Sequence, residues 1–197
     1  MDRALSVPNL LTLSRIATVP LLVAAFFLPG GWAYWVPCVL FALAGVTDFL
    51  DGYLARAWGQ QSSLGRFLDP VADKLLVAAA LMMLIAFDRI SGLAVLPAIV
   101  ILCREILVSG LREFLAELQV GLPVSRLAKW KTAIQIVSVG VLLAGEAGSA
   151  LLAAAGLALP VPTIGEVGLW AAAVLTLMTG YDYLRAGLRH MQGGAAE

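Results

Sequence analysis

The chain has 197 residues, of which 61% are hydrophobic and 13% charged, and its formal net charge is zero. A soluble domain carries about twice that share of charged residues, so the composition indicates an integral membrane protein and excludes a soluble enzyme. The balanced charge creates no overall field that would attract nucleic acid. The length predicts one domain over residues 1–197.

Six apolar stretches are long enough to cross a bilayer, which takes about 20 mostly apolar residues per helix. They predict an all-α integral membrane fold, a bundle of six transmembrane helices. In chain order the predicted spans are residues 10–28, 32–56, 64–87, 93–115, 127–143 and 165–184. The first stretch could be mistaken for a secretory signal. Because Arg15 interrupts it and five more apolar stretches follow, we interpret it as a span that stays in the protein. The stretch 145–162, broken by Gly and Pro, either extends the fifth span or forms a short interfacial helix.

The basic residues predict the orientation of the spans. With six spans both termini lie on one membrane side, and twelve of the thirteen Lys and Arg fall on that side or at its helix ends. Only Arg89 falls on the other side. Because basic loops stay in the cytoplasm, we expect the termini, the second-to-third loop and the fourth-to-fifth loop to be cytoplasmic.

Two aspartates lie on one face of the second span, near its cytoplasmic end. At 100° per residue, Asp48 and Asp51 fall within about 120° of Gly45, Gly52 and Ala55. Apart from the carboxylates, this face carries only small side chains. Small residues let helix backbones approach closely inside a membrane.

The third span repeats this arrangement, because Asp69 and Asp73 share a face with Gly65. Two such faces joined by a short loop can bring four carboxylates to one point. One alternative is that the aspartates form ordinary ion pairs at the helix ends with nearby basic residues. Those residues would be Arg56, Arg66 and Lys74.

Four carboxylates at one point repel each other unless cations lie among them. Oxygen-only ligands suit a hard divalent ion such as Mg²⁺ or Mn²⁺, and a pair of such ions is common in displacement at phosphorus. The chain has no Cys and His cluster for zinc, since its one histidine, His190, lies in the C-terminal tail. The pattern therefore predicts transfer of a phosphate-linked group. An alternative is a divalent-cation transporter, although a transporter would place its carboxylates nearer the middle of the membrane.

The spacing Asp-x2-Asp-Gly-x2-Ala-Arg-x8-Gly-x3-Asp-x3-Asp resembles the signature of the CDP-alcohol phosphotransferases. The resemblance implies six membrane helices, a divalent-metal site and a homodimer. It also implies transfer of a phosphatidyl or phosphoalcohol group from a CDP-linked donor to an alcohol, with release of CMP. The eight residues that carry it are Asp48, Asp51, Gly52, Ala55, Arg56, Gly65, Asp69 and Asp73.

Further stretches are similar to bacterial members of that family. They are "PNLLTLSRI", "LDPVADKLL", "REILVSGLRE" and "KWKT". The similarity implies CDP-diacylglycerol as donor, sn-glycerol 3-phosphate as acceptor, and a multi-pass protein of the inner membrane of a bacterium with a cytoplasmic active site. The same chemistry with phosphatidylglycerol, inositol phosphate or serine as acceptor stays an alternative.

The family resemblance also assigns roles to the aspartates. It implies that Asp48, Asp51 and Asp69 ligate metal and that Asp73, within the same metal-binding set, is the general base. The chain has no Ser or Cys activated by a neighbouring His, so we favour direct attack of the acceptor hydroxyl on the β-phosphorus.

Small and polar residues around the motif are candidates for donor binding. Gly52 and Ala55 either leave room for the nucleotide or pack helices together. Arg56 is expected to contact the nucleotide or its phosphates. Asn9 and Thr12 are candidates for binding the cytidine. The alternative is that they are an N-terminal helix cap and a polar residue at a helix interface. The donor-binding set is Asp48, Gly52, Ala55, Arg56, Gly65, Asn9 and Thr12.

The fourth span and the loop after it predict a pocket for the acceptor's phosphate. Glu105, Ser109 and Arg112 share one helix face, and an internal pair of Glu105 with Arg112 is one alternative. The positive-inside rule also places basic residues in this loop without any ligand. The predicted pocket consists of Arg112, Lys129, Lys131, Arg126 and Ser109.

Overall fold

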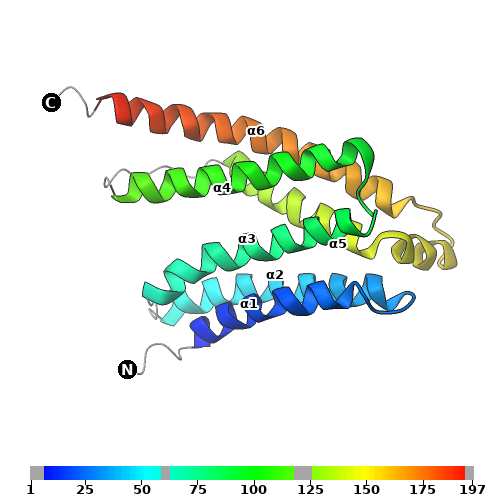
Figure 1. Ribbon diagram of the computed structural model, residues 1–197. Coiled ribbons are helices and arrows are strands. Elements are labelled where there is room, and N and C mark those ends of the chain that lie inside the picture. The colour runs from blue at the N-terminus through cyan, green and yellow to red at the C-terminus, as the bar shows by residue number, and fades with distance from the viewer. Residues whose placement is uncertain (1–6, 59–62, 118–125, 194–197) are drawn as a thin grey trace. The chain divides into compact units, whose positions relative to one another are not determined.

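The structure is a computed structural model that describes residues 7–58, 63–117 and 126–193 (Figure 1). Within these ranges, side chains are described except at 7–9, 49, 51–58, 63–67, 117, 126 and 186–193. The described chain is helical, which confirms the predicted fold class. Its helices are α1 (Val7–Ala25), α2 (Trp32–Trp58), α3 (Ser63–Ala86), the 3₁₀ turn η1 (Gly92–Ala94), α4 (Val95–Glu117), α5 (Arg126–Ala154) and α6 (Val161–Gly193).

Three stretches of the described chain are long and apolar enough to cross a membrane. They are Gly92–Ala116, Leu127–Ala154 and Val161–Arg185, and shorter apolar stretches cover Leu10–Ala25 and Trp32–Asp48. Large apolar side chains cover the outside of these helices; Ile106 and Trp130, for example, are 70% and 67% exposed. A surface of this kind suits contact with lipid rather than with water.

The stretch between the fifth and sixth predicted spans is helical up to Ala154, but a kink separates it from the first part of α5. α5 continues to Ala154, but it breaks at Gly145, where φ is 45° and ψ is −134°. This backbone angle favours glycine, and a Cβ at this position would lie 3.1 Å from the ring of Tyr34, which would have to shift slightly. The chain then turns at Gly156, also with positive φ, and enters α6.

The chain divides into two compact units, which we describe separately. The first comprises Met1–Ile90 and Val139–Gly165. In it, α1 packs against both α2 and α3 (Figure 1). Its buried core is built from apolar side chains of these helices, including Leu22, Phe41, Leu76, Leu81 and Leu84.

Arg89 ties one end of this first unit together. Its guanidinium donates to the carbonyl oxygens of Ala33 at 2.8 Å and Leu143 at 3.2 Å. The same group lies 3.8 Å from the ring centre of Tyr34 and 4.7 Å from that of Phe26. Burial lowers the pKa of Arg89 from its ordinary value. The one cation predicted for the far membrane side is thus bound by carbonyls and aromatic rings.

The second unit comprises Ser91–Ser138 and Glu166–Glu197. It contains α4, the first part of α5 and most of α6. Glycines of α6 allow close packing: Gly168 faces Ser138, and a Cβ at Gly180 would lie 3.0 Å from Cγ of Arg104. Close approach at small residues is the usual way in which membrane helices pack.

Candidate functional site

The first candidate cluster lies in the unit that contains α1, α2 and α3, and its centre is Arg15. Nη1 of Arg15 donates to Oδ1 of Asp73 at 2.9 Å and pairs with Oδ1 of Asp48 at 3.0 Å. The Arg15 side chain is 1% exposed, whereas those of Asp48 and Asp73 are 47% and 48% exposed. A buried cation of α1 thus holds two carboxylates that stay open to a ligand.

Thr12 contacts a third aspartate of the motif. Its hydroxyl donates to Oδ1 of Asp69 at 2.5 Å, and the residue is 1% exposed. This is the contact of a polar residue between two helices, which was one of the two roles considered for Thr12. Its contact with cytidine stays a prediction. All three motif aspartates with described side chains are therefore held by donors of α1.

The donor atoms of this cluster fit a hard divalent cation, because Mg²⁺ and Mn²⁺ prefer carboxylate oxygens. Asp48 and Asp73 already meet on one cationic nitrogen. Among the side chains that the structure describes, no three of Asp, Glu, His or Cys lie close enough to hold one ion by themselves. The side chain of Asp51, which was also predicted to ligate metal, lies outside that part.

The other residues predicted for donor binding lie on the same three helices. A Cβ at Gly45, one turn before Asp48 on α2, would have no described atom within 4 Å. The Asp48 face of α2 is therefore open at this point. The predicted residues whose side-chain positions lie outside the described part are Asn9, Asp51, Gly52, Ala55, Arg56 and Gly65.

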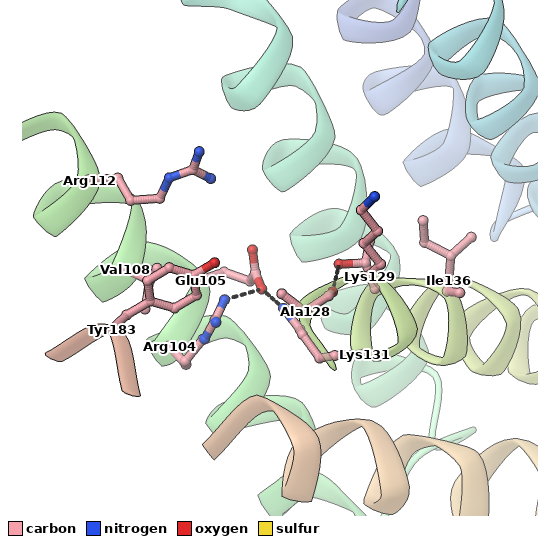
Figure 2. A pocket seen from close by; sticks show the side chains of 11 residues that line it. Arg104, Glu105, Val108, Arg112, Ala128, Lys129, Lys131, Ile136 and Tyr183 are labelled. Carbon is pink, nitrogen blue, oxygen red and sulfur yellow. Dashed lines mark hydrogen bonds and ion pairs between the residues drawn. The ribbon is translucent and has the colours of Figure 1, made fainter. Parts of the chain in front are cut away.

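The second candidate cluster lies in the other unit, where residues of α4, α5 and α6 line a cavity of about 520 Å³ (Figure 2). Apolar atoms of Val108, Ile136 and Tyr183 form part of its wall. An excess of positive charge suits a small anion that carries a phosphate. The charged lining residues are four cations and one carboxylate: Arg104, Arg112, Lys129, Lys131 and Glu105.

Glu105 engages two of these cations. Nζ of Lys131 contacts Oε1 of Glu105, and Nη1 of Arg104 lies 3.4 Å from the same oxygen. The Lys131 side chain is only 3% exposed. The partners of Glu105 are therefore Arg104 and Lys131, and not Arg112 as the shared helix face suggested. Arg104 and Arg112 lie on the same helix, but Lys131 is brought in by α5.

Arg112 and Lys129 are exposed, and their charged ends stand apart from this ion pair (Figure 2). Among the described residues neither has a carboxylate within ion-pair distance. They are therefore the cations of the cavity best placed to meet a ligand. Of the other two residues predicted for this pocket, Arg126 begins α5 with its side chain outside the described part, and Ser109 does not line the cavity.

The sequence analysis assigned no role to three residues of these clusters, which are Arg15, Arg104 and Tyr183. Arg104 donates from Nη2 to Thr179 Oγ1 at 3.0 Å and lies 5.5 Å from the ring centre of Tyr183. Nothing in the sequence connects Tyr183 to α4. Arg15 did give a signal, because an ionisable residue inside an apolar span is by default a functional candidate.

Comparison with known proteins gives a family match over residues 5–178, to CDP-alcohol phosphatidyltransferase. The CDP-diacylglycerol–glycerol-3-phosphate 3-phosphatidyltransferase of Rickettsia felis is 42% identical over 181 residues, which cover 92% of this chain and 94% of that protein. The proteins of that name from Cereibacter sphaeroides and Pseudomonas fluorescens are 38% and 40% identical. Both matches cover 95% of this chain, and they cover 97% of the first protein and 93% of the second.

Among solved structures, the chain resembles Mycobacterium tuberculosis phosphatidylinositol phosphate synthase in its apo form. The TM-score is 0.63, with 22% identity, and the match covers 93% of this chain and 90% of the other. At this identity the likeness shows the fold alone, and it agrees with a helical membrane protein.

Proposed function

The chain belongs to the CDP-alcohol phosphatidyltransferase family, and we propose that it transfers the phosphatidyl group of CDP-diacylglycerol to sn-glycerol 3-phosphate, with release of CMP. The family expected from the aspartate pattern is thus confirmed. The observation that carries the proposal is the meeting of Asp48 and Asp73 on one guanidinium with their side chains half exposed. Relatives named after this reaction, similar over 92–95% of the chain, support it.

We assign the divalent ions, two in number, to the four motif aspartates. When bound, Mg²⁺ or Mn²⁺ would neutralise charge on the diphosphate and on the leaving phosphate of CMP. The open space at Gly45 supports the approach of the donor to the Asp48 face of α2. Arg56, with Gly52, Ala55, Gly65, Asn9 and Thr12, is assigned to the nucleotide end of the donor.

We assign the general base to Asp73. Arg15 binds Oδ1 of this carboxylate and fixes its orientation, and the side chain is half exposed, so an acceptor hydroxyl could approach it. In the proposed reaction the acceptor hydroxyl oxygen forms a bond to the β-phosphorus of the donor. The bond from that phosphorus to the CMP oxygen breaks, and the hydroxyl proton passes to Asp73.

The basic cavity is the proposed site for the phosphate of the acceptor. Arg112 and Lys129 supply the charges that no carboxylate of the described chain neutralises, and a dianionic phosphate there would gain charge-assisted hydrogen bonds. Lys131 contributes through the ion pair with Glu105, which holds that carboxylate away from the phosphate. Plain glycerol has no charge to interact with these cations, and the single carboxylate of serine, next to its own ammonium group, would gain less than a dianionic phosphate.

The wider setting follows from the same reasoning. The chain is a multi-pass membrane protein, and we propose that it lies in a bacterial inner membrane with both termini and the active site on the cytoplasmic side. We also propose a homodimer. The family match runs through residues of both compact units, which supports their acting as a single domain.

The direct test is CMP release by the purified protein from CDP-diacylglycerol, with and without Mg²⁺ or Mn²⁺. Glycerol 3-phosphate, inositol phosphate, serine and phosphatidylglycerol would be offered separately as acceptors. We expect release with glycerol 3-phosphate and metal only. Preference for another acceptor would move the assignment within the family, and metal transport without CMP release would refute it.

A further inference from the structure

The first helix contributes two buried donors to the aspartate cluster, and the reaction described above leaves their joint role unexplained. Thr12 and Arg15 lie one turn apart on α1 and are each 1% exposed. Between them they contact Asp48, Asp69 and Asp73, which come from two other helices. Residues three apart on a helix share a face, so α1 presents one donor face to the whole described part of the motif.

The charges of this cluster depend on each other. A buried guanidinium is costly unless carboxylates accompany it, and two carboxylates on one point repel each other unless a cation lies between them. Nη1 of Arg15 occupies that point between Asp48 and Asp73. A divalent ion bound by the same two carboxylates would neutralise them in its place.

We propose that Arg15 is a positioning residue, an internal counter-cation that holds Asp48 and Asp73 ready for metal while no metal is bound. The inference rests on the proposed metal site. It predicts that the contribution of Arg15 to stability is large in the metal-free protein and smaller in the metal-bound protein. A residue that only packed the helices together would contribute equally in both.

The experiment measures the melting temperature of the purified protein in detergent, in EDTA and in saturating Mn²⁺. Arg15→Met keeps a long, apolar side chain in the buried position and removes the charge. In EDTA it should lower the melting temperature by about 10 °C, since it removes the cation that both carboxylates contact. Mn²⁺ should then raise the melting temperature of Arg15→Met by at least twice as many degrees as that of the wild type.

Arg89→Met is the control, because Arg89 is a partly buried arginine of the same unit that contacts carbonyls and rings instead of carboxylates. Its loss of stability should be the same in EDTA and in Mn²⁺. If Arg15→Met behaves like this control, the proposal is overturned. Arg15→Lys covers the case in which Arg15→Met does not fold. Lysine keeps the charge with a shorter reach, so its gain from Mn²⁺ should exceed that of the wild type, and an equal gain would overturn the proposal.

Failure of the metal site itself would look different. In that case Mn²⁺ would leave the melting temperature of the wild type unchanged, and CMP release would not need a divalent ion. A wild type that gains stability from Mn²⁺, combined with an Arg15→Met variant that gains no more, would refute only the role of Arg15.

Discussion

Two cations of the basic cavity should control affinity for the acceptor without controlling stability. Arg112 and Lys129 are exposed and lack carboxylate partners among the described residues, so replacing either by Ala leaves no buried charge behind. A hydrogen bond to a charged group contributes about 1.5–3 kcal/mol. Because solvent screens both side chains, we use the lower end, about 1.5 kcal/mol, which corresponds to about a tenfold change.

Arg112→Ala and Lys129→Ala should therefore each raise KM for glycerol 3-phosphate about tenfold, and the double variant about a hundredfold if the two act independently. The KM for CDP-diacylglycerol and the melting temperature should stay near wild-type values. Initial rates of CMP release, measured at varied acceptor concentration with donor held constant, give the first two quantities. The double variant should also lose most of the preference for glycerol 3-phosphate over glycerol.

Lys131→Met is the matched comparison within the same cavity. Lys131 carries the same charge as Lys129, but its side chain is 3% exposed and contacts Glu105. Its removal should lower the melting temperature by about 5–10 °C, as expected when one partner of a mostly buried pair is lost. Unchanged acceptor KM in Arg112→Ala and Lys129→Ala, together with inverted membrane insertion, would show that these charges determine topology only.

Three further predictions concern the aspartate cluster and the break in α5. Asp48→Ala and Asp69→Ala should each abolish CMP release, and excess EDTA should do the same to the wild type; full turnover in EDTA would contradict the metal assignment. Asp73→Asn should keep affinity for CDP-diacylglycerol but lose turnover, because proton removal alone is impaired; near-normal CMP release would show that the base is elsewhere. Gly145→Ala should destabilise the protein by about 1–3 kcal/mol, since alanine is strained at positive φ and its Cβ would press on the Tyr34 ring; an unchanged melting temperature would contradict this.

The sequence predicted the helices well because a membrane span depends mainly on the length of an apolar run. Each of the six predicted spans corresponds to one helix, and the helix ends moved by several residues. The fifth span was predicted to end at residue 143, but α5 continues to Ala154. The backbone leaves helical angles at Gly145, close to the predicted end, and a second helical segment follows to Ala154. Composition alone does not show whether an apolar stretch after such a glycine is helical.

Side-chain partners were harder to predict than helices. The aspartates were found because they recur at helical spacing, but their cation comes from α1; Arg15 and Asp73 are separated by 58 positions. Similarly, Glu105 pairs with Lys131, 26 positions away, instead of with Arg112 on its own helix. When a helix is apolar on most sides, its sequence does not indicate which side faces a neighbouring helix, so the contacting faces cannot be predicted.

The contacts of Arg89 affect how the first unit can move. At the Arg89 end, the segment after α3 is joined to α2 and α5 through backbone carbonyls and to the rings of Tyr34 and Phe26, and the attraction of these groups for a guanidinium does not change when a ligand binds. At the Arg15 end, α1, α2 and α3 are joined through carboxylates, whose attraction for a cation falls as soon as another cation arrives. If these helices separate during a catalytic cycle, the separation would therefore begin at the Arg15 end, while the Arg89 end stays joined and acts as the hinge.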